Sequence, residues 1–165
     1  MDQLDYLRGI QENVDKNTAV KMLREILAGE FISIHRYWTQ SKVVQGLYRD
    51  EIKKILGDHR EIGLKHADLL SSRILQLGGN PELRPLDWDN ITRCHYTQHV
   101  SWDQHEVLEN AITHKRCLTN QYSKVAEFVK ERDTTTHEII MSCLNDDYKT
   151  IKELNILNTK MNEDK

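Results

Sequence analysis

The sequence predicts an all-α protein, an up-down bundle of four long helices with a long connection between the second and third. Apolar residues recur at steps of three and four through four long stretches, the spacing of one helix face. Only two Pro and seven Gly occur in 165 residues, so few positions interrupt these stretches. Charged residues make up 30% of the chain and hydrophobic ones 38%, which is typical of helices with one face in water. Residues 1–165 are therefore expected to form one domain.

The first half of the chain is expected to hold a short leading helix and two long ones. Residues 1–14 carry four apolar residues at helical spacing: Leu4, Leu7, Ile10 and Val14. Asp15 or Asn17 can cap the next helix, whose apolar stripe covers residues 20–44. A second long helix is expected over residues 48–77, where the sequence GGNP stops it.

The second half is expected to begin with a crossover. Residues 82–97 contain two turn-prone spots and form the long connection. A third long helix is expected over residues 100–130. Asp133 and the threonines after it cap a fourth helix, which is expected to end soon after Leu154. Because residues 158–165 are polar, no fifth helix is expected.

Composition excludes several classes of protein. No apolar window of about 18 residues occurs and no apolar segment follows Met1, so neither a membrane span nor a secretory signal is expected and a cytoplasmic location is the default. Three cysteines without CxxC spacing argue against a disulfide framework. The net charge of −3 lacks the basic footprint of a non-specific nucleic-acid binder.

Polar residues interrupt the apolar faces of the first two long helices. Glu30 stands among inward-facing apolar residues, and His59, Gly63 and His66 fall on the stripe of the next helix. Burying such groups without partners costs several kcal/mol, so they must meet something. A metal ion is one candidate, and a buried hydrogen-bond network without metal is the other.

Several motifs resemble the bacterioferritin and Dps-like branch of the ferritin-like superfamily. They are GEF followed by the aromatic pair Tyr37 and Trp38, then KHADLL and RILQLGGNP, with a distant echo in SCLNDDYKTIKEL. The resemblance covers most of the chain. It implies a ferritin-like bundle with a long crossover and a function in iron storage or detoxification, in which Fe(II) is oxidised and held as Fe(III).

The family's metal motif is degenerate in this sequence. Ferritin-like di-iron proteins use a Glu from each of two helices and Glu-x-x-His from each of the other two. Glu30 matches the first Glu and His66 the first His, but Gly63 stands where the Glu before that His would be. In the last helix Asp147 and Thr150 replace the Glu and the His. The usual di-iron site is therefore expected to be impaired, with slow or absent ferroxidase activity.

The third helix leaves two alternatives for its ligand. Matching the spacing between the last two helices to the family places His114 at the ligand position. Moving this alignment by about a turn and a half places Glu109 there instead, on a helix face that mixes polar and apolar residues. We prefer His114. The resulting candidate metal ligands are Glu30, His59, His66, His114 and Asp147. Imidazoles and carboxylates together suit iron, zinc or manganese, and the loss at Gly63 and Thr150 favours one ion over two.

Two other groups of residues carry weaker signals. Cys94, His95, His99 and His105 cluster near the expected start of the third long helix, either as a chelating site or, more simply, as a solvated helix end. Leu64 holds the position of the bacterioferritin haem ligand, a Met, so no haem is expected.

The leading functional hypothesis is a ferritin-like iron-binding protein with an impaired or unusual ferroxidase centre. A catalytically silent homologue that assembles without metal is the alternative. Dps-like DNA protection is weaker, because clustered Lys and Arg are too few to neutralise phosphates. Outer apolar residues such as Trp38, Val43 and Val44 are expected to pack on a neighbouring copy, giving a dimer or a small cage.

Overall fold

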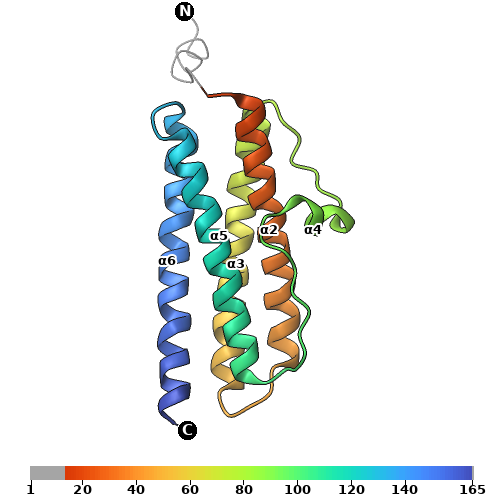
Figure 1. The fold of residues 1–165 in the computed structure, drawn as a ribbon, viewed down its shortest axis with the longest axis vertical. Coiled ribbons are helices and arrows are strands. Elements are labelled where there is room, and N and C mark those ends of the chain that lie inside the picture. Colours follow the sequence, from red (N-terminus) through yellow and green to blue (C-terminus); the bar gives the residue numbers. More distant parts are fainter. Residues whose placement is uncertain (1–13, 165) are drawn as a thin grey trace, which may run out of the picture.

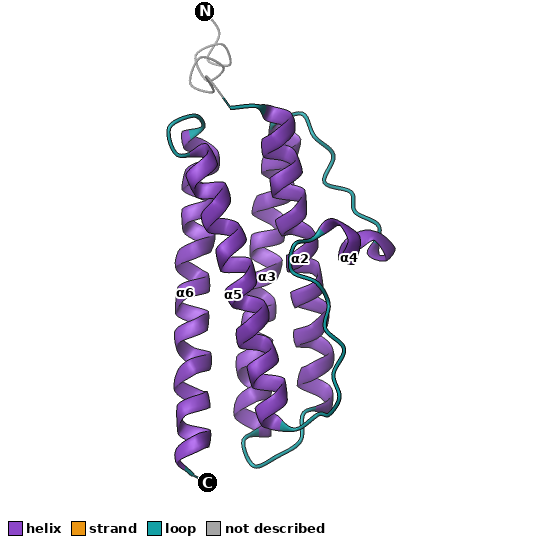
Figure 2. Cartoon of the chain, viewed as in Figure 1, coloured by secondary structure: helices purple, strands orange, loops and turns teal. Residues whose placement is uncertain are grey.

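The computed structural model describes residues 14–164, and four long helices lie side by side in it (Figure 1). They are α2 (Lys16–Val43), α3 (Arg49–Gln76), α5 (Gln104–Val129) and α6 (Thr134–Glu163). Two short helices, η1 (Pro85–Asp87) and α4 (Trp88–Ile91), belong to the connection between α3 and α5. The described residues contain no sheet, only one isolated bridge between Gln45 and Asp103 (Figure 2). The predicted all-α class is confirmed, while the leading helix expected at 1–14 lies, except for Val14, outside the described residues.

The crossover runs the length of the bundle beside α2 and brings α5 back to the end where α3 begins (Figure 1). Two hydrogen bonds fix the position at which the crossover joins α5. The Gln45 N–H donates to the Trp102 carbonyl at 2.8 Å, and the Tyr48 N–H donates to Gln104 Oε1 at 2.7 Å. Asp103 caps α5 by accepting from the His105 N–H, so the helix starts four residues later than expected.

The helix boundaries follow local chemistry. Asp15 caps α2 and Asp133 caps α6, each accepting backbone N–H groups of the first turn. Gly78 adopts a φ of +82° directly after α3, which a residue with a Cβ rarely does. These signals were readable in the sequence.

The end of α6 differs from the expectation. The helix continues to Glu163, well past Leu154. Leu157 and Met161 are buried on its inner face, so two apolar residues at helical spacing hold the otherwise polar tail against the bundle. The polar residues between them face outward, which is why composition alone misjudged this segment.

Two apolar clusters fill the interior at different heights. One joins the start of α2 to the end of α3, and its members include Leu23, Leu27, Leu70, Val125 and Ile140. The other lies toward the opposite end and includes Ile52, Leu56, Leu108 and Leu154. Most of the buried residues between these clusters along each helix are polar. The candidate site therefore lies in a polar layer between two apolar ones.

A disulfide links the crossover to α5, contrary to the sequence expectation. Cys94 and Cys117 are bonded, with their Cα atoms 5.8 Å apart and a sequence separation of 23. Only the path of the crossover over α5 brings the two thiols together, and cysteine spacing does not reveal that path. Cys143 is buried and free, and burial raises the pKa of its thiol to about 12. None of the described helices is long and apolar enough to cross a membrane.

Candidate metal centre

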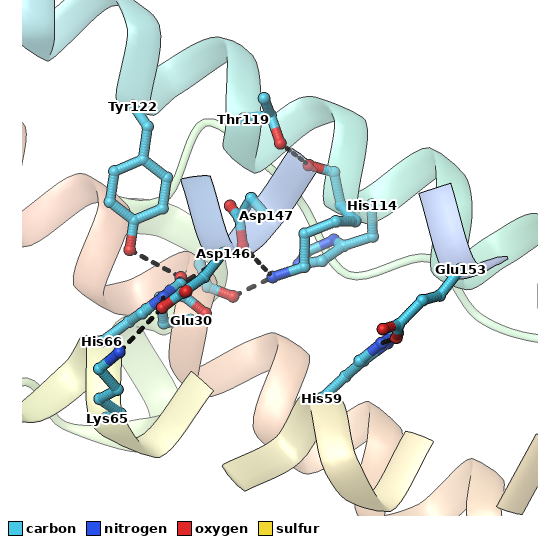
Figure 3. A network of polar contacts seen from close by, with 12 residues as sticks. Glu30, His59, Lys65, His66, His114, Thr119, Tyr122, Asp146, Asp147 and Glu153 are labelled. Carbon is cyan, nitrogen blue, oxygen red and sulfur yellow. Dashed lines mark hydrogen bonds and ion pairs between the residues drawn. The ribbon is translucent and has the colours of Figure 1, made fainter. Parts of the chain in front are cut away.

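Three potential metal ligands converge from three helices in the polar layer. Glu30 on α2, His66 on α3 and Asp147 on α6 each offer a ligand atom, and these atoms lie within 4.8 Å of one another (Figure 3). All three side chains are fully buried. Glu30 lies one turn after Ile26 and Leu27, so the apolar stripe of α2 turns its carboxylate inward. The sequence predicted all three residues.

His66 is held between two carboxylates. Its Nδ1 lies 3.0 Å from Glu30 Oε1, and its Nε2 lies 3.2 Å from Asp146 Oδ2. A carboxylate only accepts hydrogen bonds, so both ring nitrogens donate when His66 is protonated. Burial lowers the pKa of His66, but the hydrogen bond to Glu30 and the attraction of Glu30 and Asp147 outweigh burial and raise it. In this arrangement both ring nitrogens of His66 already face a carboxylate oxygen, so a metal can bind His66 only after one of these contacts is broken.

Lys115 on α5 is the residue that the sequence analysis missed. It is fully buried, and its Nζ donates to Asp147 Oδ1 at 2.9 Å. Burial lowers the pKa of the Lys115 ammonium, but attraction to Asp147 and Glu30 outweighs burial and raises it above its ordinary value. The ammonium is therefore charged inside the bundle.

A signal for Lys115 was present in the sequence. Leu108, Ala111, Leu118 and Tyr122 are buried on α5, and Lys115 completes their alternating steps of three and four. The stripe chosen from the sequence ran through His114 instead, one position earlier. A lysine at an inward position of an apolar stripe points to a buried carboxylate partner.

The two carboxylates differ in their surroundings. Glu30 Oε1 accepts from Tyr122 Oη at 2.7 Å as well as from His66. Burial raises the pKa of Glu30, but the attraction of Lys115 and the hydrogen bonds from His66 and Tyr122 lower it to about 2. Burial raises the pKa of Asp147 to about 6, with Lys115 opposing that rise. Asp147 is therefore the carboxylate that takes a proton first as the pH falls.

The other predicted ligands lie outside this group. His59 is buried, but its Nε2 contacts Glu153 Oε2 at 3.0 Å, apart from the central cluster (Figure 3). His114 Nε2 lies 3.3 Å from the Gly29 carbonyl, and burial lowers its pKa to about 4. Glu109, the alternative on α5, lines an outer pocket with Ile112, Thr113, Arg116, Asn155 and Asn158.

Gly63 and Thr150, two positions where the sequence departs from the predicted motif, lie beside the centre or in the same polar layer. A Cβ on Gly63 would lie 3.5 Å from Glu30 Oε2, so the missing Glu would have extended toward that carboxylate. Thr150 is buried, and its Oγ1 has no hydrogen-bond partner. Glu30 Oε2 and Asp147 Oδ2 are also buried without a partner. The centre thus contains buried acceptors without a partner, and neither Gly63 nor Thr150 offers the carboxylate or imidazole that the predicted motif would place there.

The histidines near the crossover form no chelating site. His95 and His99 lie in an irregular segment, not one helical turn apart. The His99 side chain is buried, contacts Gln40 and packs against Trp102, with ring centroids 5.0 Å apart. Cys94 is in the disulfide, so its sulfur is not available as a thiolate ligand. His99 serves to attach the crossover to α2.

Comparisons with known proteins identify the family. The Ferritin-like domain model matches residues 20–163. The chain belongs to the ferritin-like family. This assignment covers almost the whole bundle, including all three converging ligands.

Among solved structures, this ferritin-like protein is similar to a dodecameric thioferritin, the bacterioferritin-related protein from Bacteroides fragilis. The two share 27% identity over 95% of this chain and 92% of the other, with a TM-score of 0.89. Dps from Thermosynechococcus elongatus is similar in fold, at 17% identity over 86% and 90% of the chains and a TM-score of 0.80.

Sequence relatives lie in the same two groups. A DNA protection during starvation protein from Pyrococcus furiosus is 22% identical over 81% of this chain and 73% of its own length. A bacterial ferritin from Paramagnetospirillum magnetotacticum is 30% identical over 46% of each chain. The predicted resemblance to bacterioferritin and Dps proteins is confirmed.

Proposed function

We propose that this protein binds iron as a subunit of a ferritin-like assembly that stores or detoxifies it, and that its central site takes at most one divalent ion. The observation that carries the proposal is the convergence of Glu30, His66 and Asp147, with ligand atoms within 4.8 Å. The unpartnered Glu30 Oε2 and Asp147 Oδ2 add acceptors for a cation. Mixed imidazole and carboxylate ligands suit iron, and also zinc or manganese.

Iron oxidation at this centre is expected to be slow or absent. A metal pair needs carboxylates that span both ions. Gly63 supplies no ligand, Asp147 reaches less far than Glu would, and Thr150 replaces an imidazole. Exchanging anionic ligands for neutral groups leaves more positive charge on a metal pair, which disfavours the second ion.

Assembly into a homo-oligomer, a dimer or a small shell, is part of the proposal. An outer pocket of about 530 Å³ between α2 and α3 is lined by Phe31, Ile34, His35, Trp38, Arg60, Glu61, Leu64 and Trp88. Trp38 is 52% exposed in the single chain, so this surface is suited to a neighbouring copy. Val43 is also exposed, but Val44 is buried within its own chain, so its predicted role in the contact is wrong.

The second candidate is a silent homologue that assembles without metal. Lys115 and His66 favour it, because the Lys115 ammonium already pairs with Asp147 and both ring nitrogens of His66 already face carboxylates. DNA protection remains the weakest candidate, given the net charge of −3. A cytoplasmic location and the absence of haem remain predictions, and cell fractionation and absorption spectroscopy test them.

Iron retention tests the proposed function. Purified protein is supplied with Fe(II) in air, passed through size exclusion and analysed for iron in the oligomer peak. We expect iron to co-elute with the oligomer and to stay bound through a second passage in chelator-free buffer. An oligomer that elutes free of iron favours the silent homologue instead.

A further inference from the structure

The third long helix supplies the centre with an amine rather than a metal ligand. Lys115 Nζ lies 2.9 Å from Asp147 Oδ1, and this oxygen lies 3.9 Å from His66 Nδ1. Both members of the Lys115–Asp147 pair are buried, at 1% and 0% side-chain exposure. The amine thus occupies Asp147 Oδ1, and Oδ2 is the oxygen of this carboxylate that remains without a partner.

We propose that the Lys115 ammonium and a divalent ion exclude each other at this centre, so that Lys115 is a tethered cation that keeps the wild-type centre poor in metal. The inference rests on the proposed function for the use of Glu30, His66 and Asp147 as ligands.

Charge balance supports the exclusion. Lys115 already contributes one positive charge, in direct contact with the Asp147 carboxylate. Glu30 and Asp147 therefore do not face an incoming cation as two unpaired negative charges. A divalent ion would add two positive charges beside an ammonium in a poorly screened interior, where repulsion is strong.

Geometry supports it independently. The ammonium donates to Asp147 Oδ1, and the imidazole is held by Glu30 and Asp146 on opposite sides. A metal that used these three residues would have to bind the free carboxylate oxygens beside the ammonium or displace the ammonium from Asp147 Oδ1, and it would have to break one contact of the imidazole. A neutral residue at position 115 removes the ammonium and leaves the carboxylates in place.

Zinc titration by calorimetry tests the proposal. Zn²⁺ is added to the wild-type protein and to the variants Lys115→Met and Lys115→Gln. We expect both variants to gain a site for one ion per subunit, bound at least about tenfold more tightly than at the wild-type centre. Lys54→Met is the matched control, because Lys54 is exposed and pairs with Asp58 on the outside of α3. Unchanged zinc affinity in folded Lys115→Met or Lys115→Gln overturns the proposal.

A second substitution locates the new site. Adding Asp147→Asn to Lys115→Met should abolish the gain, whereas a gain that persists shows that zinc binds elsewhere and contradicts the proposal. Surface histidines contribute equally to all the proteins compared, so only the difference between variants is used.

Wild-type crystals soaked in Zn²⁺ provide a test that needs no variant. Anomalous density absent from the centre, or present with Lys115 turned away, agrees with exclusion. An ion held by Glu30 and Asp147 while Lys115 Nζ still contacts Asp147 overturns it. Neither zinc experiment measures iron retention, so failure of the storage function is distinguishable from failure of this inference.

Discussion

Replacing Lys115 by Met should destabilise the metal-free protein by several kcal/mol at neutral pH. Lys115 and Asp147 form a fully buried ion pair, and removing one partner of such a pair typically costs about 3–5 kcal/mol. Protonation limits the loss, because Asp147 without its ammonium takes up a proton. Protonating a carboxyl of ordinary pKa about 3.9 at pH 7 costs about 4 kcal/mol, at 1.36 kcal/mol per unit. The two estimates agree.

Asp147 also sets the sign of the pH dependence. In the folded Lys115→Met variant Asp147 lacks its positive partner, so its pKa lies far above the value in the unfolded chain. The folded variant therefore binds one more proton than the unfolded chain and loses stability as the pH rises. Between about pH 4 and 7 the free energy of unfolding of the variant should fall by nearly 1.4 kcal/mol per pH unit. In the wild-type protein the pKa of Asp147 is about 6, so the difference between the two proteins should shrink from pH 7 to pH 5.

Urea denaturation with EDTA, at fixed protein concentration, measures both effects. The double variant Lys115→Met with Asp147→Leu should recover most of the lost stability, because an apolar pair replaces both charges. Lys54→Met should change stability by less than about 1 kcal/mol, because its ion pair is exposed. A loss below about 1 kcal/mol for Lys115→Met at pH 7, or one that does not vary with pH, would refute the reasoning.

Three further outcomes are expected. Replacing Cys94 and Cys117 by Ser should lower the free energy of unfolding by about 3 kcal/mol, given the sequence separation of 23 between the cysteines, and an unchanged denaturation midpoint would contradict this loop-closure reasoning. Asp133→Asn should cost about 3–5 kcal/mol at pH 7, because buried Arg73 loses its carboxylate partner at 2.9 Å. Burial raises the pKa of Asp133, but the hydrogen bonds from Thr136 and the pairing with Arg73 outweigh burial and lower it, so the cost of the substitution should fade as the pH drops below about 4. Denaturation at pH 7 and at pH 3 measures this change, and an equal cost at both pH values would count against the ion pair. Trp38→Glu should reduce the oligomer to smaller species in light scattering after size exclusion. An unchanged mass would show that Trp38 does not contribute to the contact between subunits.

The fold was predictable because its determinants are local. Helical periodicity, the Asp15 and Asp133 caps and the glycines after α3 each act within a few residues of chain. The length of α6 was missed because two apolar residues, Leu157 and Met161, outweighed a polar composition.

The site was predictable only in part, because a shift of one residue along a helix changes which side chain faces the bundle interior. Glu30, His66 and Asp147 converge as expected, whereas His59 and His114 have partners of their own. On α5 the inward position is Lys115, next to the predicted His114, and this one-residue difference turns a supposed ligand into a cation.

The disulfide and the position of His99 depend on the path of the crossover. Cys94 meets Cys117, and His99 meets Gln40, through contacts between segments far apart in the chain. No local pattern in a single sequence encodes that path.

The central claim is that this ferritin-like protein lacks a working di-iron centre within its subunit. Metal analysis of the purified protein, combined with stopped-flow measurement of Fe(II) oxidation, tests it most directly. We expect at most one tightly bound divalent ion per subunit and slow or absent oxidation. Two irons per subunit with rapid oxidation would contradict it, and would show that Gly63, Lys115 and Thr150 do not prevent the chemistry.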